Sequence, residues 1–323
     1  MIYKNSLRKK HIVNKVFIDI CESFFYSLDF SLFKAVFFQA DHIIDPSCNV
    51  FFVDDTKNNV GAFKIRGAYN SITTAKNRFP NLKGIVAASS GSFGMSCAIC
   101  SKNIGLSSKI FVPKTAPSLK VDKIRELGGD VEVCGNSYED SKALAIDFSK
   151  NDEGYYFQDG VTDDVFVGNS SLAYELIEFI KHNEINGNIA VVIPLGIGSL
   201  LVPVSRVLKA YLSNVSIISV EPLTHAKLHS FNSGFKPSYD STLADGASVK
   251  FFPEFSKNHV LSLVDYYTQI DEESISNSML FFKNINMKFE GAAAMTYAVY
   301  KDNSNFFSNF DSVFLFMTGS NVS

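Results

Sequence analysis

The sequence predicts an α/β fold with two open, doubly wound parallel-sheet domains and an active site in the cleft between them. Short β-branched runs alternate with segments of helical period at nearly even spacing, as in βαβ units. Several predicted strands of the second half of the chain are almost entirely apolar, which is typical of strands covered on both faces. The chain has 323 residues, and chains beyond about 250–300 residues tend to divide into domains. We expect a large domain of residues 1–83 and 162–323, with a small domain, 84–161, inserted in it.

The first run of elements alternates strands and helices in the order expected for a parallel sheet. The predicted strands are "GIVAAS" (84–89), "SKIFVP" (108–113) and "DVEVCG" (130–135). The predicted helices are 94–105, 118–129 and 137–150. We expect Ser118 and Ser137 to cap the last two helices, and Gly105 and Gly128 to end the first two.

The pattern resumes in the second half of the chain. It predicts helices over 170–183 and 200–212 and strands over 188–196, 215–222 and 312–320. The last strand runs almost to the end of the sequence, so no regulatory domain is expected after it. Residues 1–28 begin with basic residues, but Asp19 and Glu22 interrupt the apolar part and no cleavage site follows. We predict an amphipathic helix there, packed on the body of the protein.

Composition excludes several classes of function. The net charge is −3, and the basic residues are scattered rather than clustered, which argues against a nucleic-acid partner. No stretch reaches the roughly 18 apolar residues of a membrane span. Five cysteines are too few for a disulfide scaffold and suit a reducing compartment. A cytoplasmic protein without a membrane association is expected.

Two turns combine small residues with a strand-to-helix junction. "PLGIGSLL" (194–201) offers free backbone N–H groups at a helix N-terminus, where a phosphate would be favoured. It lacks the third glycine of a dinucleotide fingerprint. "SSGSFG" (89–94) adds hydroxyls to a second possible anion site and would suit a substrate carboxylate. A tight turn explains the first stretch equally well, and a serine-rich turn with a helix cap explains the second.

Two other patterns favour structural explanations. Cys97 and Cys100 form a CxxC, but they lie at apolar positions within a helix and no second pair exists, so core cysteines are expected. His225 and His229 are four residues apart and could bind a metal from one helix face. No glutamate stands between them in the metalloprotease position, so a packed or solvated pair is the better interpretation.

The stretch "GAFKIRGAYN" (61–70) crowds small residues around Lys64. Together with the two turns, it suggests a lysine that forms a Schiff base with a phosphorylated aldehyde. The order of this motif, "SSGSFG", "PLGIGSLL", "VEP", "ADG", "EGAAA" and "TGSN" resembles the β family (fold type II) of pyridoxal-phosphate enzymes. Within that family the sequence is most similar to serine/threonine dehydratases and serine racemase. The resemblance covers about residue 40 to the last residue.

The resemblance implies a role for each motif. Lys64, following Phe63, would bind the cofactor covalently and act as the base on the substrate's α-proton, while its small neighbours let a flat ring approach. Glu290 would lie near the cofactor ring, and Thr318 would face its pyridine nitrogen. The turn that would cradle the phosphate in the large, cofactor-binding domain comprises Gly196, Ile197, Gly198, Ser199 and Leu200. The family has a run of glycines there, which Ile197 and Ser199 break; backbone donors survive if their φ angles stay negative.

The serine-rich turn would bind substrate and part of the cofactor. The substrate-binding residues implied by the resemblance are Ser89, Ser90, Gly91 and Phe93. Ser92 stands where relatives place an asparagine that contacts the cofactor, and Phe93 where histidine is frequent. Ser90 matches a serine that works in racemases on the face opposite Lys64. It is therefore a second candidate catalytic residue.

Two further stretches bear on the branch of the family. "ADG" (244–246) favours the dehydratases and racemases over cysteine synthases. Glu221 matches a glutamate that racemases use at a cation site. Lys227 falls near the expected second acidic ligand, so our hypothesis is that its ammonium replaces the metal ion and that no metal is bound.

The resemblance implies a pyridoxal 5'-phosphate-dependent ammonia-lyase that converts a β-hydroxy amino acid, such as L-serine or L-threonine, to a 2-keto acid. It also implies a homodimer. One alternative is an amino-acid racemase or β-replacement enzyme that makes a non-standard amino acid. A second is a catalytically degenerate binding protein that keeps the fold, although retention of Lys64 argues against it.

Overall fold

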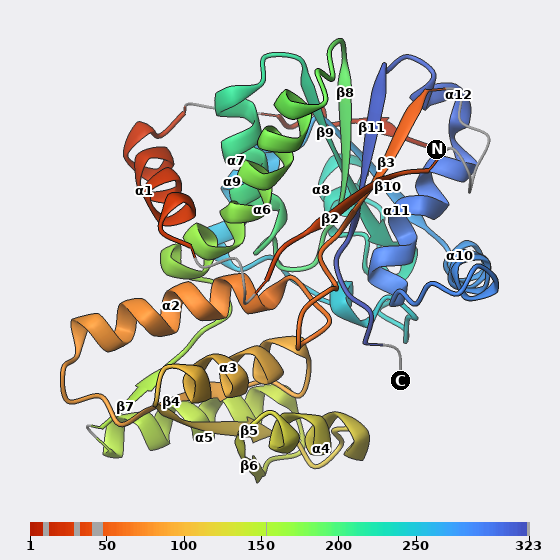
Figure 1. The fold of residues 1–323 in the computed structure, drawn as a ribbon. Coiled ribbons are helices and arrows are strands. Elements are labelled where there is room, and N and C mark those ends of the chain that lie inside the picture. Colours follow the sequence, from red (N-terminus) through yellow and green to blue (C-terminus); the bar gives the residue numbers. More distant parts are fainter. Residues whose placement is uncertain (9–12, 29–32, 41–47, 153, 322–323) are drawn as a thin grey trace. The chain divides into compact units, whose positions relative to one another are not determined.

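The computed structural model describes residues 1–8, 13–28, 33–40, 48–152 and 154–321. Their contacts form two compact units, which we call the large unit (Met1–Gly61 with Asn169–Val322) and the small unit (Ala62–Gly168). Each unit has its own sheet with helices packed on it (Figure 1). The grouping places residues 62–83 in the small unit. The domain boundaries predicted at 83/84 and 161/162 stay a prediction.

The small unit is built on a four-stranded parallel sheet in the order β6-β5-β4-β7. The strands are β4 (Gly84–Ala88), β5 (Ser107–Val112), β6 (Asp130–Val133) and β7 (Tyr155–Phe157). The helices are α2 (Lys64–Arg78), α3 (Ser92–Asn103), α4 (Ser118–Glu126) and α5 (Tyr138–Asn151). The βαβαβα run predicted between residues 84 and 150 is therefore confirmed.

One of the two predicted helix caps is confirmed and the other is wrong. The Ser137 hydroxyl accepts a hydrogen bond from the Asp140 N–H at 3.1 Å, and the Asp140 carboxylate accepts one from the Ser137 N–H at 3.1 Å. Ser118 is already the first helical residue of α4, and Pro117 precedes it with an extended ψ of 132°. Pro117 is therefore the N-cap residue, and the Ser118 side chain does not cap the helix.

The large unit contains a seven-stranded sheet in the order β1-β10-β9-β8-β11-β3-β2. Its five inner strands are parallel, and the two edge strands, β1 and β2, pair antiparallel. The strands are β1 (Tyr3–Lys4), β2 (Val36–Gln39), β3 (Asn49–Asp54), β8 (Ile189–Pro194), β9 (Val215–Pro222), β10 (Tyr266–Ile270) and β11 (Ser312–Met317). The predicted mixed α/β fold with parallel sheets is confirmed in both units.

Helices flank this sheet, and Figure 1 shows α7 and α11 on its opposite faces. They are α1 (Lys15–Tyr26), α6 (Asp163–His182), α7 (Leu201–Tyr211), α8 (Lys227–Ser233), α9 (Glu254–Leu263), α10 (Glu272–Asn284), α11 (Gly291–Asp302) and α12 (Ser304–Phe307), with short 3-10 turns η1 (Leu223–His225) and η2 (Asp245–Ala247). Helix α6 starts seven residues before the predicted 170, because Asp163 and Asp164 suit the positive end of a helix.

The N-terminal 28 residues do not form the single helix that was predicted. Tyr3 and Lys4 pair antiparallel with β10, and α1 begins only after Asn14, whose side chain accepts a hydrogen bond from the Phe17 N–H at 3.2 Å. Residues 9–12 of the predicted helix lie outside the described residues. Helix α1 is amphipathic, with Phe17 and Phe25 buried.

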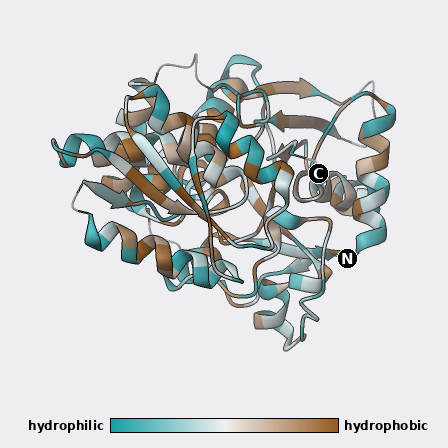
Figure 2. Cartoon of the chain, turned by 90° about the horizontal axis from the view of Figure 1, so that it is seen from below, coloured by the Kyte–Doolittle hydropathy of each residue, from teal (hydrophilic) through white to brown (hydrophobic). Residues whose placement is uncertain are grey.

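Apolar residues are frequent on the strands, as Figure 2 shows, while the helices carry both apolar and polar residues. The inner strand β11 is buried along its whole length. Strands of this kind must be covered on both faces, as the sequence predicted. Within the described ranges, every helix is too short or too polar to cross a membrane.

Candidate active site

Lys64 is the first residue of α2, and Phe63 occupies the N-cap position. The Lys64 Nζ lies 4.8 Å from the centre of the Phe63 ring. The ring face attracts an ammonium, whereas the positive end of the helix dipole disfavours one, and each effect is about 0.5–1 kcal/mol. The two effects act on the ammonium in opposite directions.

Glycines near Lys64 have packing reasons that the sequence did not reveal. Gly61 has a φ of +69°, and a Cβ there would lie 2.8 Å from the Ser320 Oγ. A Cβ on Gly168, at the start of α6, would lie 2.3 Å from the Arg66 carbonyl oxygen and 2.8 Å from the Gly67 Cα. The backbones of α2 and α6 therefore approach too closely for a side chain between them.

The predicted substrate turn leads from β4 into α3 in the small unit. A Cβ on Gly94 would lie 2.3 Å from the Ser89 carbonyl oxygen, so the turn closes only over glycine. The Ser89 hydroxyl accepts a hydrogen bond from the Gly91 N–H at 3.2 Å. Ser92 is the first residue of α3, and Ser90 and Phe93 are half-buried. The Phe93 ring lies 3.7 Å from the position of a Cβ on Gly160.

The predicted phosphate turn, residues 196–200, joins β8 to α7 in the large unit. Gly198 has a φ of +89°, while Ile197 and Ser199 have negative φ. Negative φ angles at these two residues are the condition under which the turn keeps its backbone donors despite the side chains, so that condition is met. Throughout the described chain, no hydrogen bond engages the backbone N–H groups of these five residues. The turn presents these N–H donors at a helix N-terminus, as an anion site requires.

A chain of close contacts joins this turn to the other predicted cofactor residues. A Cβ on Gly196 would lie 3.0 Å from the Gly246 carbonyl oxygen, and a Cβ on Gly246 would lie 3.2 Å from the Glu290 Oε1. The Glu290 N–H donates to the Gly319 carbonyl at 2.9 Å. Thr318 is buried immediately after β11. The "ADG", "EGAAA" and "TGSN" motifs thus meet beside the carboxyl ends of the parallel strands.

The predicted site residues divide between the two units. Lys64 and Phe63 belong to the small unit, as do residues 89–93. Gly196–Leu200, Glu290 and Thr318 belong to the large unit, which brings all of them together. The assignment of these residues to the site stays a prediction.

Glu221 and Lys227 form a buried ion pair in the large unit. The Lys227 Nζ lies 3.0 Å from the Glu221 Oε1, and each side chain is 2% exposed. Glu221 also accepts hydrogen bonds from the N–H groups of Lys227 (3.1 Å) and Leu228 (2.8 Å). Burial raises the pKa of Glu221, and Lys227 opposes that rise. The ammonium lies beside Glu221 as expected; that it replaces a metal ion stays a hypothesis.

The two patterns assigned to structure are confirmed as such. Cys97 and Cys100 are buried in α3, where burial raises the pKa of both thiols, that of Cys100 to about 12. His225 bonds to the Thr224 and Ser248 hydroxyls, and the His229 ring packs among three aromatic rings. Across the described ranges, no group of three or more His, Cys, Asp or Glu side chains could hold a metal ion.

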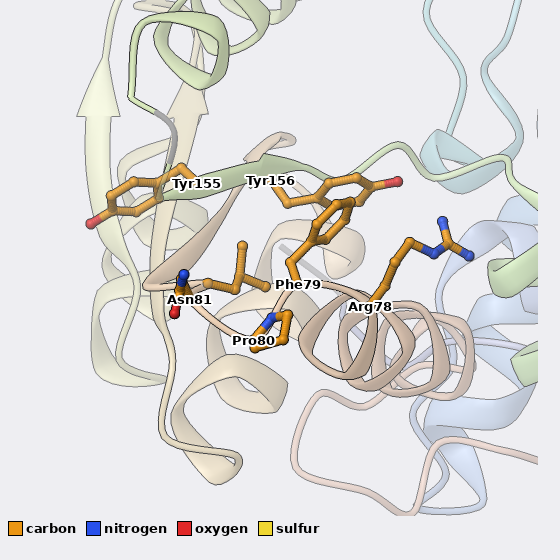
Figure 3. A pocket seen from close by; sticks show the side chains of 7 residues that line it. Arg78, Phe79, Pro80, Asn81, Tyr155 and Tyr156 are labelled. Atoms are coloured by element: carbon orange, nitrogen blue, oxygen red, sulfur yellow. The ribbon is translucent and has the colours of Figure 1, made fainter.

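A surface pocket of about 270 Å³ lies elsewhere on the small unit (Figure 3). It is lined by residues at and after the end of α2 and on β7, among them Arg78. The rings of Phe79 and Tyr156, which also line it, have their centres 5.5 Å apart. None of the predicted site residues lines it. The pocket is therefore separate from the chemistry that the motifs indicate.

Residues 40–319 match the family described as "Pyridoxal-phosphate dependent enzyme". The chain belongs to this family. It is 30% identical over 258 residues to a catabolic L-threonine dehydratase of Staphylococcus aureus, covering 76% of this chain and 71% of that protein. It is 29% identical over 231 residues to the biosynthetic threonine dehydratase 2 of Solanum lycopersicum, covering 71% of this chain. The match spans only 38% of the tomato protein's length.

Solved structures show the same fold. The processed form of threonine deaminase isoform 2 from Solanum lycopersicum matches with a TM-score of 0.85 at 23% identity, covering 100% of this chain and 88% of that one. Maize serine racemase matches with a TM-score of 0.84 at 21% identity, covering 97% and 95%. At these identities the likeness establishes the fold type and leaves the activity open.

Pyridoxal phosphate is the cofactor of this family, and the large unit fits its phosphate. The five unengaged N–H groups of residues 196–200 supply donors without any cationic side chain. The left-handed Gly198 lets the backbone wrap closely, since a side chain there would be strained. Backbone donors carry the fit, so the two non-glycine residues do not disqualify the turn.

Sequence reasoning missed the residues that hold these motifs in place. Gly246 and Gly319 enclose the Glu290 carboxylate, and the Asn169 side chain donates to the Ser199 carbonyl at 2.8 Å. The local signal for Asn169 was an asparagine, a poor helix former, within the helix α6. The two glycines gave no signal beyond their motifs.

Gly319→Ala tests whether the position of Glu290 matters. The added Cβ would lie 2.2 Å from both the Cδ and the Oε1 of Glu290, so that side chain must move. We expect about tenfold lower turnover and a stability loss of about 1–3 kcal/mol. Assays in a Glu290→Ala background provide the control. If Gly319→Ala lowers turnover by the same factor in the Glu290→Ala background as in the wild type, the added methyl group does not act through Glu290.

Proposed function

We propose that the chain is a pyridoxal-phosphate-dependent ammonia-lyase acting on a β-hydroxy amino acid such as L-serine or L-threonine. The observation that carries the proposal is the set of unengaged N–H donors at residues 196–200, joined through Gly246 to Glu290 and Gly319. The curated relatives named threonine dehydratase and L-threonine ammonia-lyase support the choice of reaction. The match spans about half the length or less of several of those relatives, so the reaction of the whole protein is part of the proposal.

In this proposal, the large unit holds the cofactor and Lys64 moves the proton. Bound pyridoxal phosphate supplies an electron sink that acidifies the substrate's Cα–H bond. The Lys64 Nζ takes that proton, the Cβ–O bond breaks, and the proton leaves with the hydroxyl as water. The released enamine then hydrolyses to a 2-keto acid and ammonia.

Thr318 favours elimination over slower reactions. Its hydroxyl is proposed to face the ring nitrogen, and within the described chain no hydrogen bond engages it. A neutral hydroxyl does not hold that nitrogen protonated, unlike a carboxylate. The sink is then weaker, so rapid loss of a β-leaving group is favoured over reactions that need a long-lived carbanion.

Product analysis tests the choice of reaction. The purified holoprotein is incubated with L-serine and with L-threonine, each with and without an added thiol. Equal amounts of keto acid and ammonia, unaffected by the thiol, are expected. An amino acid that carries the thiol's sulfur would instead establish β-replacement, and no turnover of either amino acid would contradict the proposed reaction.

A racemase is the second candidate, because Ser90 supplies a hydroxyl in the turn that follows β4. Ser90→Ala is expected to lower the rate of D-amino-acid formation by about a hundredfold or more, since it removes the second proton carrier. Elimination, which needs only Lys64, is expected to change by less than about threefold. Chiral chromatography of the products measures both reactions. Loss of elimination together with racemisation would contradict this division of roles.

We further propose that the protein acts as a homodimer in the cytoplasm. No disulfide joins the cysteines of the described chain, which suits a reducing compartment. Sedimentation analysis of the holoprotein tests the dimer.

A further inference from the structure

Asn169 holds one peptide of the phosphate turn in place. Its Nδ2 donates to the Ser199 carbonyl at 2.8 Å, and the side chain is 1% exposed. A carbonyl oxygen can only accept, so the amide must present its nitrogen to Ser199. The contact joins α6 to the turn across 30 residues of sequence.

This contact also determines where a backbone donor points. In a trans peptide the carbonyl and the N–H of the next residue point in opposite directions. Anchoring the Ser199 carbonyl on Asn169 therefore directs the Leu200 N–H away from α6. That N–H belongs to the five donors that nothing in the described chain engages.

The same side chain also has an atom that is unfavourable for the stability of the fold. Its Oδ1 is buried and has no hydrogen-bond partner among the described residues. A buried polar atom left unpaired is unfavourable, and asparagine is also a weak helix former within α6. A residue chosen only for stability would be apolar here, as Leu172 and Leu176 are further along the helix.

We infer that Asn169 is a positioning residue for the cofactor phosphate, which presets the Leu200 N–H by fixing the Ser199 carbonyl. The inference rests on the phosphate turn assigned above and does not depend on which reaction the protein catalyses. It predicts an effect specific to the phosphate group. A purely structural residue would instead affect binding of the whole cofactor equally.

The test compares two ligands that differ only in the phosphate. Apoprotein is titrated with pyridoxal 5'-phosphate and with pyridoxal, and the ratio of the two affinities is measured. Asn169→Leu keeps the branched shape of the side chain and removes the donor, so we expect the affinity for pyridoxal phosphate to fall by about ten- to hundredfold. The affinity for pyridoxal is expected to stay within about twofold. The melting temperature of the apoprotein should change little, because the variant removes the unpaired Oδ1 but leaves the Ser199 carbonyl without its donor.

Two further variants keep the inference falsifiable. Asn169→Gln retains an amide donor and should keep most of the preference for the phosphorylated ligand. Asn5→Ala removes another buried amide of the large unit, which donates to the Leu261 and Val264 carbonyls, and should leave the affinity ratio unchanged. Equal loss of both ligands in Asn169→Leu, or an unchanged ratio, would overturn the inference. If Asn169→Leu does not fold, Asn169→Ser is measured instead. A wild-type ratio of the two affinities in that variant would also overturn the inference.

Discussion

Lys64→Ala is expected to lower the rate of keto-acid formation by at least about a thousandfold, because it removes both the covalent attachment point and the base. The visible absorption band that depends on covalent attachment of the cofactor should also disappear. Borohydride reduction of the wild-type holoprotein should add the cofactor's mass to the peptide that contains Lys64. A small added amine should restore part of the activity of the variant.

Lys76→Ala provides the matched control for that experiment. Lys76 belongs to the same helix, α2, and its Nζ donates to the Ile104 carbonyl. The control variant should keep the absorption band and full activity. If Lys64→Ala retains the band, or if the reduced cofactor is found on another lysine, Lys64 does not have the proposed role.

Lys227→Met is expected to cause the largest loss of stability. The variant leaves the Glu221 carboxylate, which is 2% exposed, without its ion-pair partner. Breaking a buried ion pair from one side costs about 3–5 kcal/mol, because the remaining charge is uncompensated. Denaturant unfolding measures the change. The double variant Glu221→Gln/Lys227→Met should recover most of the loss, since no buried charge remains.

The stability of Lys227→Met should depend on pH in a defined direction. Burial raises the pKa of Glu221 above its ordinary value of 4.5, and removing Lys227 takes away a group that opposed the rise. The folded variant therefore binds a proton more tightly than the unfolded chain, so its stability is greatest in acid and falls as the pH rises. We expect it to be more stable at about pH 5 than at about pH 8.

His225 titrates nearby in the opposite sense and must be controlled. Its pKa is lowered by burial and by Lys227 and Lys250, so its protonation in acid destabilises the folded state. The double variant retains His225 and lacks Glu221, and its pH profile isolates the carboxylate. A Lys227→Met profile identical to that of the double variant would contradict the account. Chelating agents should leave wild-type activity unchanged if the ammonium stands in for a metal ion.

The repeated strand and helix pattern made the parallel sheets predictable. Strands such as Val215–Pro222 and helices such as α5 carry a strong period and clear ends, and both were located to within one or two residues. The edge strands β1 and β2 were not foreseen, because elements of two and four residues carry almost no pattern. Their pairing depends on contacts with residues far along the chain.

Motif order indicated the candidate site, but side-chain positions needed the structure. The turn at residues 196–200 was predicted as an anion site from its place between a strand and a helix, and the family resemblance joined Thr318 to it. The contact from Asn169 to Ser199 and the enclosure of Glu290 by Gly246 and Gly319 were not predicted. Such contacts join residues far apart in the sequence, and nothing in the local sequence records them.

The most direct test of the account is an absorption spectrum of the purified holoprotein, recorded before and after addition of L-serine and then L-threonine, with keto acid measured in the same cuvette. The account predicts a visible band that shifts or decays with one of these amino acids as keto acid accumulates. If no band forms even with added pyridoxal phosphate, or if the band responds to neither amino acid and no keto acid appears, the proposed lyase function is wrong.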